Sequence, residues 1–248
     1  MTVRHRDLRV DWLGYATLRI EAADGPTVYL DPGRYGVLTG EWESDSEDHR
    51  HPPARDYRPE DGDLVCVSHV HHYDPDGIDR VAADDATVVV HEAVHHSETD
   101  RDVTPVRDLP YDTRRVDDET DTVVADVVLR TTAAYNHPDG PRTDGSGTPI
   151  HPEGTGCGFL LDFDGTSVFW PGDSDVLEGH AELDVSLFCP SISSSFTMDR
   201  HDAADLAARL DPGLVLPIHY DTFPALESDA DAFVVDVAAR GVPVALDC

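Results

Sequence analysis

The chain has 248 residues, 40% of them hydrophobic, with a net charge of −32 at pH 7, and all 18 of its basic residues are arginine. So large an acidic excess leaves no basic stripe to neutralise phosphates, which argues against a nucleic-acid partner, and recurring apolar segments argue against disorder. No apolar run is long enough to span a bilayer and the start does not resemble a signal peptide, so we expect a cytoplasmic protein, and the acidity predicts a very salty cytosol.

Short strands separated by turn residues are predicted through the first half of the chain. The segments 8–14, 16–22 and 27–33 have strand character, and residues 23–26 read as a hairpin-type turn between the last two. Residues 39–61 are polar and contain prolines, which predicts a surface loop. A buried strand is expected at 63–69, a short helix at 76–84 and another strand at 86–92.

The second half adds two longer helices to further strands. Strands are predicted within 121–136, and 140–149 is a flexible loop. Residues 156–175 read as a hairpin that turns at Asp164 and Gly165, followed by a strand at 185–190. A helix at 197–211 has Thr197 as its predicted N-cap. A strand at 213–220, a helix at 229–241 and a last strand at 242–246 complete the pattern, without a repeat or a Gly/Ser-rich linker. One domain over residues 1–248, with two sheets covered by helices, fits best.

The four cysteines do not form a metal motif. Cys66, Cys157, Cys189 and Cys248 are widely scattered, without a CxxC pair, which excludes a cysteine-based zinc finger. Three of them lie in or near apolar segments and are predicted to be small buried hydrophobic residues.

Polar residues that can bind metal follow several predicted strands. The segment "VCVSHVHHYDPDGI" at 65–78 places three histidines within four positions. Side chains at the ends of several strands can converge on one rim of a fold, and imidazole with carboxylate suits zinc, or iron and manganese where carboxylates are more numerous. Asp31, His69, His71, Asp173 and His219 follow predicted strands, and His151 precedes the strand that begins at residue 156.

The order of these residues and the sequence segments around them resemble the metallo-β-lactamase superfamily, and within it the ascorbate-6-phosphate-lactonase-like metal-dependent hydrolases. "DWLGYATLRIEAADGPTVYLDPG" is similar to the opening hairpin of that group, and "SHVHHYDPDGI" stands where the family has its HxHxDH signature. "HPEGTGCGFLLDFDGTSVFWPGDSD" and "LVLPIHYDTFP" are similar to the stretches that carry the later ligands. The resemblance implies an α/β fold of the αββα four-layer sandwich type, with two mixed sheets flanked by helices, in a protein of a halophilic archaeon.

The resemblance also implies a ligand set, with His151, Asp173 and His219 as ligands and Asp173 bridging two metals. In the signature itself, an ungapped alignment gives His69 and His71 as the HxH pair, with Tyr73 on the family's aspartate and Asp74 on its last histidine. A two-residue deletion makes His72 the last histidine and removes the aspartate, and an alignment from the other side keeps His72 and Asp74 but puts Pro75 on a histidine. We assign His69 and His71 with His151 to a first metal, and Asp173 and His219 with His72 or Asp74 to a second. His137 is a weaker rival of His151.

The other roles in this site are assigned by chemistry. Asp31 is a candidate partner for a ligand imidazole. Asp74 and Asp173 are the candidate catalytic carboxylates, with Asp74 as a proton shuttle to the leaving group. Tyr220, and also Tyr73, could donate to a developing oxyanion. Arg34 or Arg142 could offset the acidic surface locally for an anionic substrate.

The predicted function is a zinc-dependent hydrolase of a small-molecule ester, lactone or phosphoester that uses a metal-bound hydroxide. It holds one or two Zn²⁺, with Mn²⁺ or Fe²⁺ as alternatives, and needs no nucleic acid or membrane; association into a homo-oligomer stays open. Two alternatives remain: a nuclease or phosphodiesterase of the same superfamily, and a metal-binding module that has lost catalysis. No GxSxG elbow, Walker loop or GxGxxG motif points to another mechanism.

Overall fold

Two mixed β-sheets form the framework of the computed structural model, which describes residues 2–99 and 101–247. The first sheet has seven strands in sequence order: β1 (Val3–His5), β2 (Leu8–Gly14), β3 (Thr17–Ala22), β4 (Thr27–Leu30), β5 (Gly62–Val67), β6 (Ala82–His91) and β7 (Asp112–Val116). The second sheet has six, in the order β13 (Leu214–Val215), β12 (Leu187–Phe188), β11 (Thr166–Trp170), β10 (Cys157–Phe163), β9 (Val127–Ala133) and β8 (Asp121–Val124). The predicted α/β class with two mixed sheets is confirmed.

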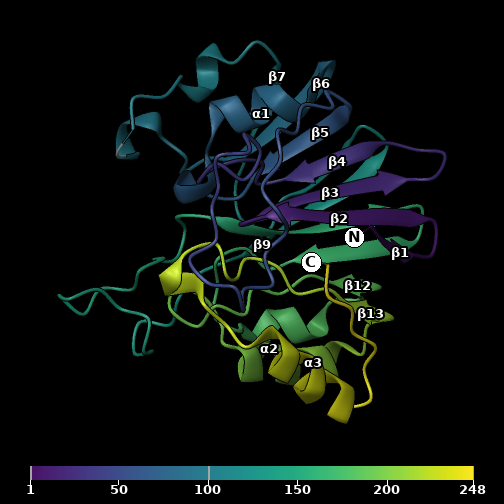
Figure 1. Cartoon of the computed structure of the whole chain (residues 1–248). Helices are drawn as coiled ribbons and strands as arrows, with labels where there is room; N and C mark the ends of the chain where they lie inside the picture. Colours follow the sequence, from purple (N-terminus) through teal and green to yellow (C-terminus); the bar gives the residue numbers. More distant parts are fainter. Residues whose placement is uncertain (1, 100, 248) are drawn as a thin grey trace.

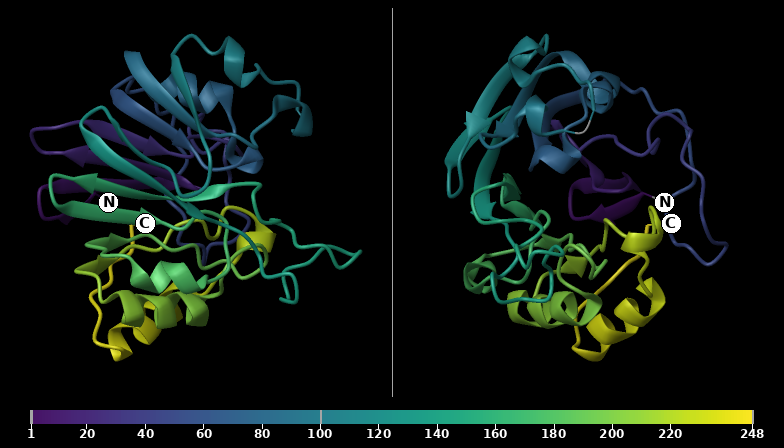
Figure 2. Two further views of the ribbon diagram at one scale, coloured as in Figure 1. Left: turned by 180° about the vertical axis from the view of Figure 1, so that it is seen from behind. Right: turned by 90° about the vertical axis from the view of Figure 1, so that its left-hand side faces the viewer.

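Helices flank these sheets. Figure 1 shows α1 (Pro75–Val81) beside β5 and β6, and α2 (Arg200–Leu210) and α3 (Ala230–Ala239) together near β12 and β13. Figure 2 gives two further views of the same arrangement. Short 3₁₀ turns are η1 (Val70–His72), η2 (His96–Glu98), η3 (Val106–Asp108), η4 (Glu178–Glu182) and η5 (Pro224–Leu226). Within the described ranges, none of the helices has both the length and the apolar character to cross a bilayer.

Each sheet changes from antiparallel to parallel pairing along its width. Strands β1 to β4 are antiparallel, whereas β4 to β7 are parallel. In the second sheet β8 to β11 are antiparallel, and β11, β12 and β13 are parallel. The carboxyl ends of parallel neighbours lie at one edge of a sheet, which is where ligand-bearing loops gather in such folds.

Packing between the sheets explains why the strand patterns fold this way. Alternate residues of β2, such as Val10 and Trp12, are buried, and β10 of the second sheet buries Phe159 and Leu161 in the same manner. A period of two with one apolar face buries that face against a second sheet. The side chains of Cys66, Cys157 and Cys189 are buried as predicted, whereas Cys248 lies outside the described residues.

The structure corrects several element predictions. Asp199, not Thr197, is the N-cap of α2, because its carboxylate accepts hydrogen bonds from the backbone N–H groups of His201 and Asp202. Thr197 is buried, with its hydroxyl 2.7 Å from that of Ser191. Residues 242–246 form no strand and only an isolated bridge, from Val244 to Val215. Strands β1 and β7, short and largely polar at their exposed positions, were not predicted.

Acid is expected to destabilise the fold through a buried histidine. Burial lowers the pKa of His51 from 6.5 to about 4. Its Nδ1–H donates to the carbonyl of Pro52 at 2.8 Å, and its Nε2 accepts from the backbone N–H of Tyr15 at 3.2 Å, an acceptance that protonation would abolish. Since the folded pKa is depressed, this stability is present above the unfolded pKa of 6.5 and is lost as the pH falls toward 4. The loss is on the order of 3 kcal/mol.

Urea unfolding across that pH window measures the effect. His51→Gln keeps an acceptor but cannot titrate, so its free energy of unfolding should vary less with pH than that of the unmodified chain. His95→Gln, at an exposed histidine, is the matched control and should follow the unmodified chain. Equal pH dependence in all three proteins would contradict the prediction.

Candidate metal centre

Three of the site's histidines come from a single 3₁₀ turn at the end of β5. His69 is extended, with φ −159°, and η1 follows it immediately. The backbone N–H of His72 donates to the carbonyl of His69 at 3.2 Å, which closes the turn and brings the two rings together, with centroids 4.2 Å apart. His71 lies on the outer side of the turn, where its Nδ1 is 3.2 Å from His151 Nε2. All three imidazoles therefore reach the site, although the signature departs from the family pattern.

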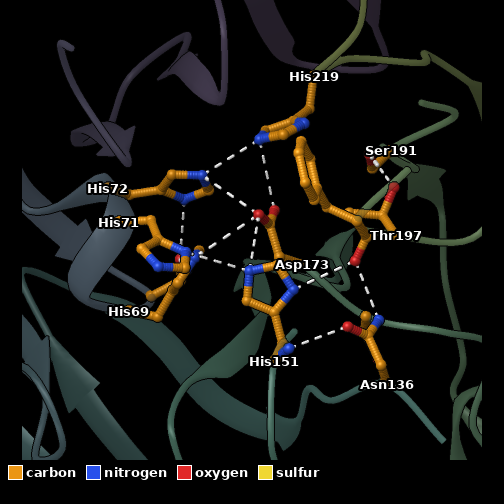
Figure 3. A network of polar contacts seen from close by, with 12 residues as sticks. His69, His71, His72, Asn136, His151, Asp173, Ser191, Thr197 and His219 are labelled. Carbon is orange, nitrogen blue, oxygen red and sulfur yellow. Dashed lines mark hydrogen bonds and ion pairs between the residues drawn. The ribbon is translucent and has the colours of Figure 1, made fainter. Parts of the chain in front are cut away.

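Asp173 lies at the centre of the cluster, after β11 (Figure 3). Its Oδ2 is 3.5 Å from His151 Nε2, 3.6 Å from His69 Nε2 and 3.7 Å from His72 Nε2. Its Oδ1 is 3.5 Å from His219 Nε2. Gly172 precedes it with φ +69°, and a Cβ there would lie 2.6 Å from the carbonyl oxygen of Cys157. A glycine is therefore needed to bring this carboxylate to the floor of the site.

The last histidine is held in an uncommon backbone conformation. His219 has φ +59°, in the left-handed region, and its backbone N–H donates to the carbonyl of Tyr15 at 3.0 Å. Tyr15 and Asp31 also have positive φ values, of 50° and 46°. Such conformations cost energy outside glycine and gather at functional sites, where the surrounding structure holds them.

Polar contacts at Nδ1 fix the orientation of the His72 and His151 rings. Asp31 Oδ2 is 3.0 Å from His72 Nδ1, and the same carboxylate accepts from the Ser68 backbone N–H at 2.7 Å and from Trp170 Nε1 at 3.0 Å. His151 Nδ1 is 3.2 Å from the carbonyl of Phe196, to which it can donate. In each ring the Nε2 is thereby directed at the cluster with its lone pair available, as metal ligation requires.

Burial keeps these rings neutral. It lowers the pKa of His69 and His72 well below the usual value, that of His151 to about 4 and that of His219 to about 3. Burial, followed by the charge of Asp31, raises the pKa of Asp173 well above its usual range. Neutral imidazole is the form that ligates metal, and a cation in their midst would favour the ionised carboxylate.

The donor set fits a divalent metal. His69 Nε2 and Asp173 Oδ1 are buried and have no hydrogen-bond partner within the described residues. The potential ligand atoms form two groups, and the atoms within each group lie within 4.8 Å of one another. The first group comes from His69, His71 and His151, and the second from His69, His72 and Asp173. Ligands about 2.1 Å from a tetrahedral ion are about 3.4 Å apart, close to the separations found here.

A cavity of about 420 Å³ opens above the cluster. Its floor includes His71, His151, Asp173 and His219. Its walls are mainly aromatic and apolar, with one guanidinium and one carboxylate, and include Tyr15, Arg34, Tyr35, Val70, Glu98, Thr99, Ile150, Phe196 and Phe223. The volume suits a small molecule, and the lining suits one with an apolar part.

Several residues named from the sequence lie elsewhere. Asp74 precedes α1, accepts from the backbone N–H of Arg34 at 2.6 Å and has its other oxygen 3.6 Å from Arg101, so it faces away from the cluster. Tyr220 is buried and stacks on Trp12, with ring centroids 4.5 Å apart, because neighbouring residues of the turn point in different directions. These contacts do not support a ligand role for Asp74 or a catalytic role for Tyr220.

The remaining alternatives are also outside the cluster. The hydroxyl of Tyr73 donates to the carbonyl of Thr104 at 2.7 Å. The ring of His137 contacts the carbonyl of Val176 at 3.1 Å. His151, and not His137, therefore occupies the candidate ligand position for which the two were alternatives. Arg142 is buried in ion pairs away from the cavity, whereas Arg34 lines it.

Tyr15 is the cavity residue that sequence reasoning missed. Its ring centroid is 4.7 Å from that of His219 and 4.9 Å from that of His72. Tyr35 and Phe223 extend this aromatic wall, with centroids 4.8 Å apart. The only local signal was the Gly14–Tyr15 turn of the first hairpin, which does not differ from an ordinary turn until the distant ligands are placed beside it.

Comparisons with known proteins agree with this geometry. Residues 9–219 match a family model described as a β-lactamase superfamily domain. A UPF0173 metal-dependent hydrolase of Exiguobacterium is 36% identical over 101 residues, which is 38% of this chain and 44% of that protein. The chain thus aligns with less than half the length of that relative. A second UPF0173 metal-dependent hydrolase, from Methanopyrus kandleri, is 27% identical over 96% of this chain and 94% of the relative.

Solved structures share the architecture. A metallo hydrolase from Ignicoccus hospitalis superposes with a TM-score of 0.65 at 18% identity, covering 96% of this chain and 94% of that one. A metallo-β-lactamase fold protein from Bacillus subtilis superposes with a TM-score of 0.63 at 12% identity, covering 96% and 95%. At these identities the likeness establishes the fold.

Proposed function

The chain belongs to the metallo-β-lactamase superfamily, and on that premise we propose that it is a metal-dependent hydrolase of a small-molecule ester, lactone or phosphoester. The observation that carries the proposal is the convergence of four histidine Nε2 atoms on the two oxygens of Asp173, at 3.5–3.7 Å, on the floor of a cavity. The names of the relatives support hydrolysis, and the aromatic walls support a small substrate.

The ligand set would be shared between two ions. His69, His71 and His151 would hold one, and His72, Asp173 and His219 the other. A histidine-rich set of this kind favours zinc, with manganese or iron as alternatives. A divalent metal bound there lowers the pKa of a bound water and polarises an oxygen of the substrate.

Two wall residues would position the substrate. Burial, and then the charge of Asp173, raises the pKa of Tyr15 well above its usual range, so its hydroxyl keeps its proton near neutral pH and can donate to developing negative charge on the substrate. Arg34 is fixed by a 2.6 Å hydrogen bond to the carbonyl of His71, which directs a positive charge at the cavity. A substrate with an anionic substituent would be oriented by it.

Substrate and habitat are further parts of the proposal. The likeness to the lactonase-like group makes lactones the first class to try, and the absence of lysine weighs against a nuclease. We place the protein in the cytoplasm of a salt-adapted archaeon, because a net charge of −32 needs screening.

The test is turnover of a substrate panel in molar KCl. The panel contains lactones, carboxylate esters, phosphomonoesters and single-stranded RNA, and is offered to the metal-loaded, the chelated and the Zn²⁺-restored or Mn²⁺-restored protein. We expect metal-restored hydrolysis of a small molecule, with activity falling on dilution into low salt. Cleavage of RNA alone would favour the nuclease. Less than one bound ion per chain, with no turnover, would favour a module without catalysis.

A further inference from the structure

Asp74 stands within the segment that resembles the metal signature, yet its carboxylate faces away from the ligand cluster. It is the N-cap residue of α1, a position from which an aspartate usually accepts hydrogen bonds from the first N–H groups of its own helix. Its side chain makes no such bond. The carboxylate is instead directed at two loops that border the cavity, so its role lies outside α1.

The first of these loops has an uncommon backbone. Four successive residues have φ in the left-handed region: Gly33 (104°), Arg34 (67°), Tyr35 (49°) and Gly36 (78°). Two of them are not glycine, so the conformation costs energy and persists only where surrounding contacts hold it. Asp74 Oδ2 supplies such a contact, because it accepts from the backbone N–H of Arg34 at 2.6 Å. A Cβ at Gly33 would lie 2.5 Å from the same oxygen, so the carboxylate rests directly on the loop backbone.

This loop brings a positive charge to the wall of the cavity. The guanidinium of Arg34 donates from Nη1 to the carbonyl of His71 at 2.6 Å, and its Cζ lies 4.9 Å from the centroid of the Tyr35 ring. Among the described residues, no carboxylate forms an ion pair with it. The charge is therefore available to an anionic group of a bound molecule.

The other oxygen of Asp74 is directed at a second loop of the cavity wall. Asp74 Oδ1 is 3.6 Å from Arg101 Nη1, and Arg101 Nη2 donates to the carbonyl of Tyr73. The hydroxyl of Thr99, a residue that lines the cavity, donates to the carbonyl of Arg101 at 2.9 Å. One carboxylate thus connects the loop of Arg34 with the loop of Thr99.

We propose that Asp74 is a positioning residue, which holds Arg34 in the wall of the metal cavity so that its guanidinium binds an anionic group of the substrate. The inference rests on the proposed function and narrows its substrate class to small esters or lactones that carry a separate anionic group. Asp74 acts through the backbone of the Arg34 loop. Its removal should therefore weaken the binding of anionic substrates and leave the metal ligands in place.

Two measurements that need no turnover test the position of Asp74. Asp74→Ala should bind as many ions per chain as the unmodified protein, and its Arg34 backbone amide should exchange hydrogen about 10-fold faster, because a hydrogen bond to a charged group is lost. Asp74→Asn keeps an oxygen acceptor and should stay close to the unmodified protein in both measurements. Asp76→Ala is the matched control, since it removes an exposed carboxylate of α1 that pairs with Arg80 at 2.7 Å.

Selectivity between two esters separates positioning from a general structural role. The probes are para-nitrophenyl hemisuccinate, which has a free carboxylate, and para-nitrophenyl butyrate, which is neutral and has an acyl chain of the same length. In Asp74→Ala, KM for the hemisuccinate should rise about 10-fold with kcat unchanged, while both constants for the butyrate stay the same. Arg34→Gln should show the same loss, and the double variant should add little to it, since both substitutions act on one guanidinium.

Loss of a bound ion from Asp74→Ala would make Asp74 a metal ligand and overturn the proposal. Unchanged exchange at the Arg34 amide, or an equal rise in KM for both esters, would also overturn it. Asp74→Ser, whose hydroxyl can cap α1, is a second variant in case Asp74→Ala folds poorly. A protein that hydrolyses neither ester would count against the proposed function alone, because ion count and amide exchange still decide whether Asp74 holds Arg34.

Discussion

Replacing Asp173 by asparagine is expected to lower kcat/KM by at least about 10³-fold, equivalent to about 4 kcal/mol of transition-state stabilisation. The substitution keeps the shape of the side chain and removes the negative charge at the point on which His69, His72, His151 and His219 converge. Both carboxylate oxygens face ligand nitrogens, and an amide offers only one oxygen to the two sides. We therefore expect at least one ion per chain to be lost together with activity.

Metal content and turnover, measured on the same preparation, check this result. Asp205→Asn is the matched control, because that carboxylate is exposed and pairs with Arg240 on the far side of α2. It should keep both metal and activity. Full activity in Asp173→Asn with an unchanged ion count would remove this aspartate from the site.

The framework of the site was readable from the sequence because each of its supports is local. The apolar runs that became β4, β5, β11 and the segment around β13 end at Asp31, His69, Asp173 and His219. The end of a strand fixes the position of the residue that follows it. Strand ends could therefore be identified from the apolar runs alone, without knowledge of how the two sheets pack. The family resemblance supplied the order in which these ends meet.

The signature could not be resolved from spacing alone. No alignment of this segment filled every ligand position of the signature: either Tyr73 or no residue stood at the aspartate, or Pro75 stood at the last histidine. The 3₁₀ turn over Val70–His72 instead brings His72 beneath His69 and leaves His71 within reach of His151. Whether such a turn forms depends on the backbone around it, which a pattern of ligand types does not describe.

The direction of a side chain that follows a turn could not be predicted from the sequence either. Tyr220 follows His219 directly but is turned into the core against Trp12. Tyr15, from a hairpin some two hundred residues earlier, instead lies against the rings of His72 and His219. His219 and Tyr15 both have φ values in the left-handed region, so the chain turns there differently from an extended or right-handed helical backbone. A substitution at either position would be judged wrongly from sequence neighbours alone.

The loop that delivers His151 depends on a buried ion pair, and breaking it is expected to cost about 3–5 kcal/mol of unfolding free energy. Arg142 lies 2.9 Å from Asp175, with side chains 9% and 3% exposed. Among the described residues, Arg142→Met would leave the buried Asp175 carboxylate two donors, the backbone N–H of His137, at 2.8 Å, and the side-chain amide of Asn136, at 3.3 Å. An uncompensated buried charge is the reason for so large an effect.

The same substitution should weaken metal binding at a distance. The carbonyl of Arg142 accepts from the backbone N–H of Ile150, directly before His151, and Asn136 accepts from the His151 backbone N–H at 3.0 Å. Arg142 and Asp175 therefore hold in place the loop segment from which the His151 side chain extends into the cluster. We expect about a 10-fold to 100-fold loss of metal affinity, the usual effect of removing a group that orients a ligand.

Urea unfolding and zinc titration separate these two effects. Arg130→Met is the matched control, because Arg130 pairs with Asp121 at 2.6 Å on the surface, where both side chains are at least half exposed and solvent screens the pair, so its loss should change stability little. The double variant Arg142→Met with Asp175→Asn leaves no unpaired buried charge, because Asp202, the other carboxylate paired with Arg142, is nearly half exposed. It should therefore regain much of the stability but not the metal affinity, since the loop stays untied. If the single variant proved as stable as the control, the ion pair would have no part in holding His151.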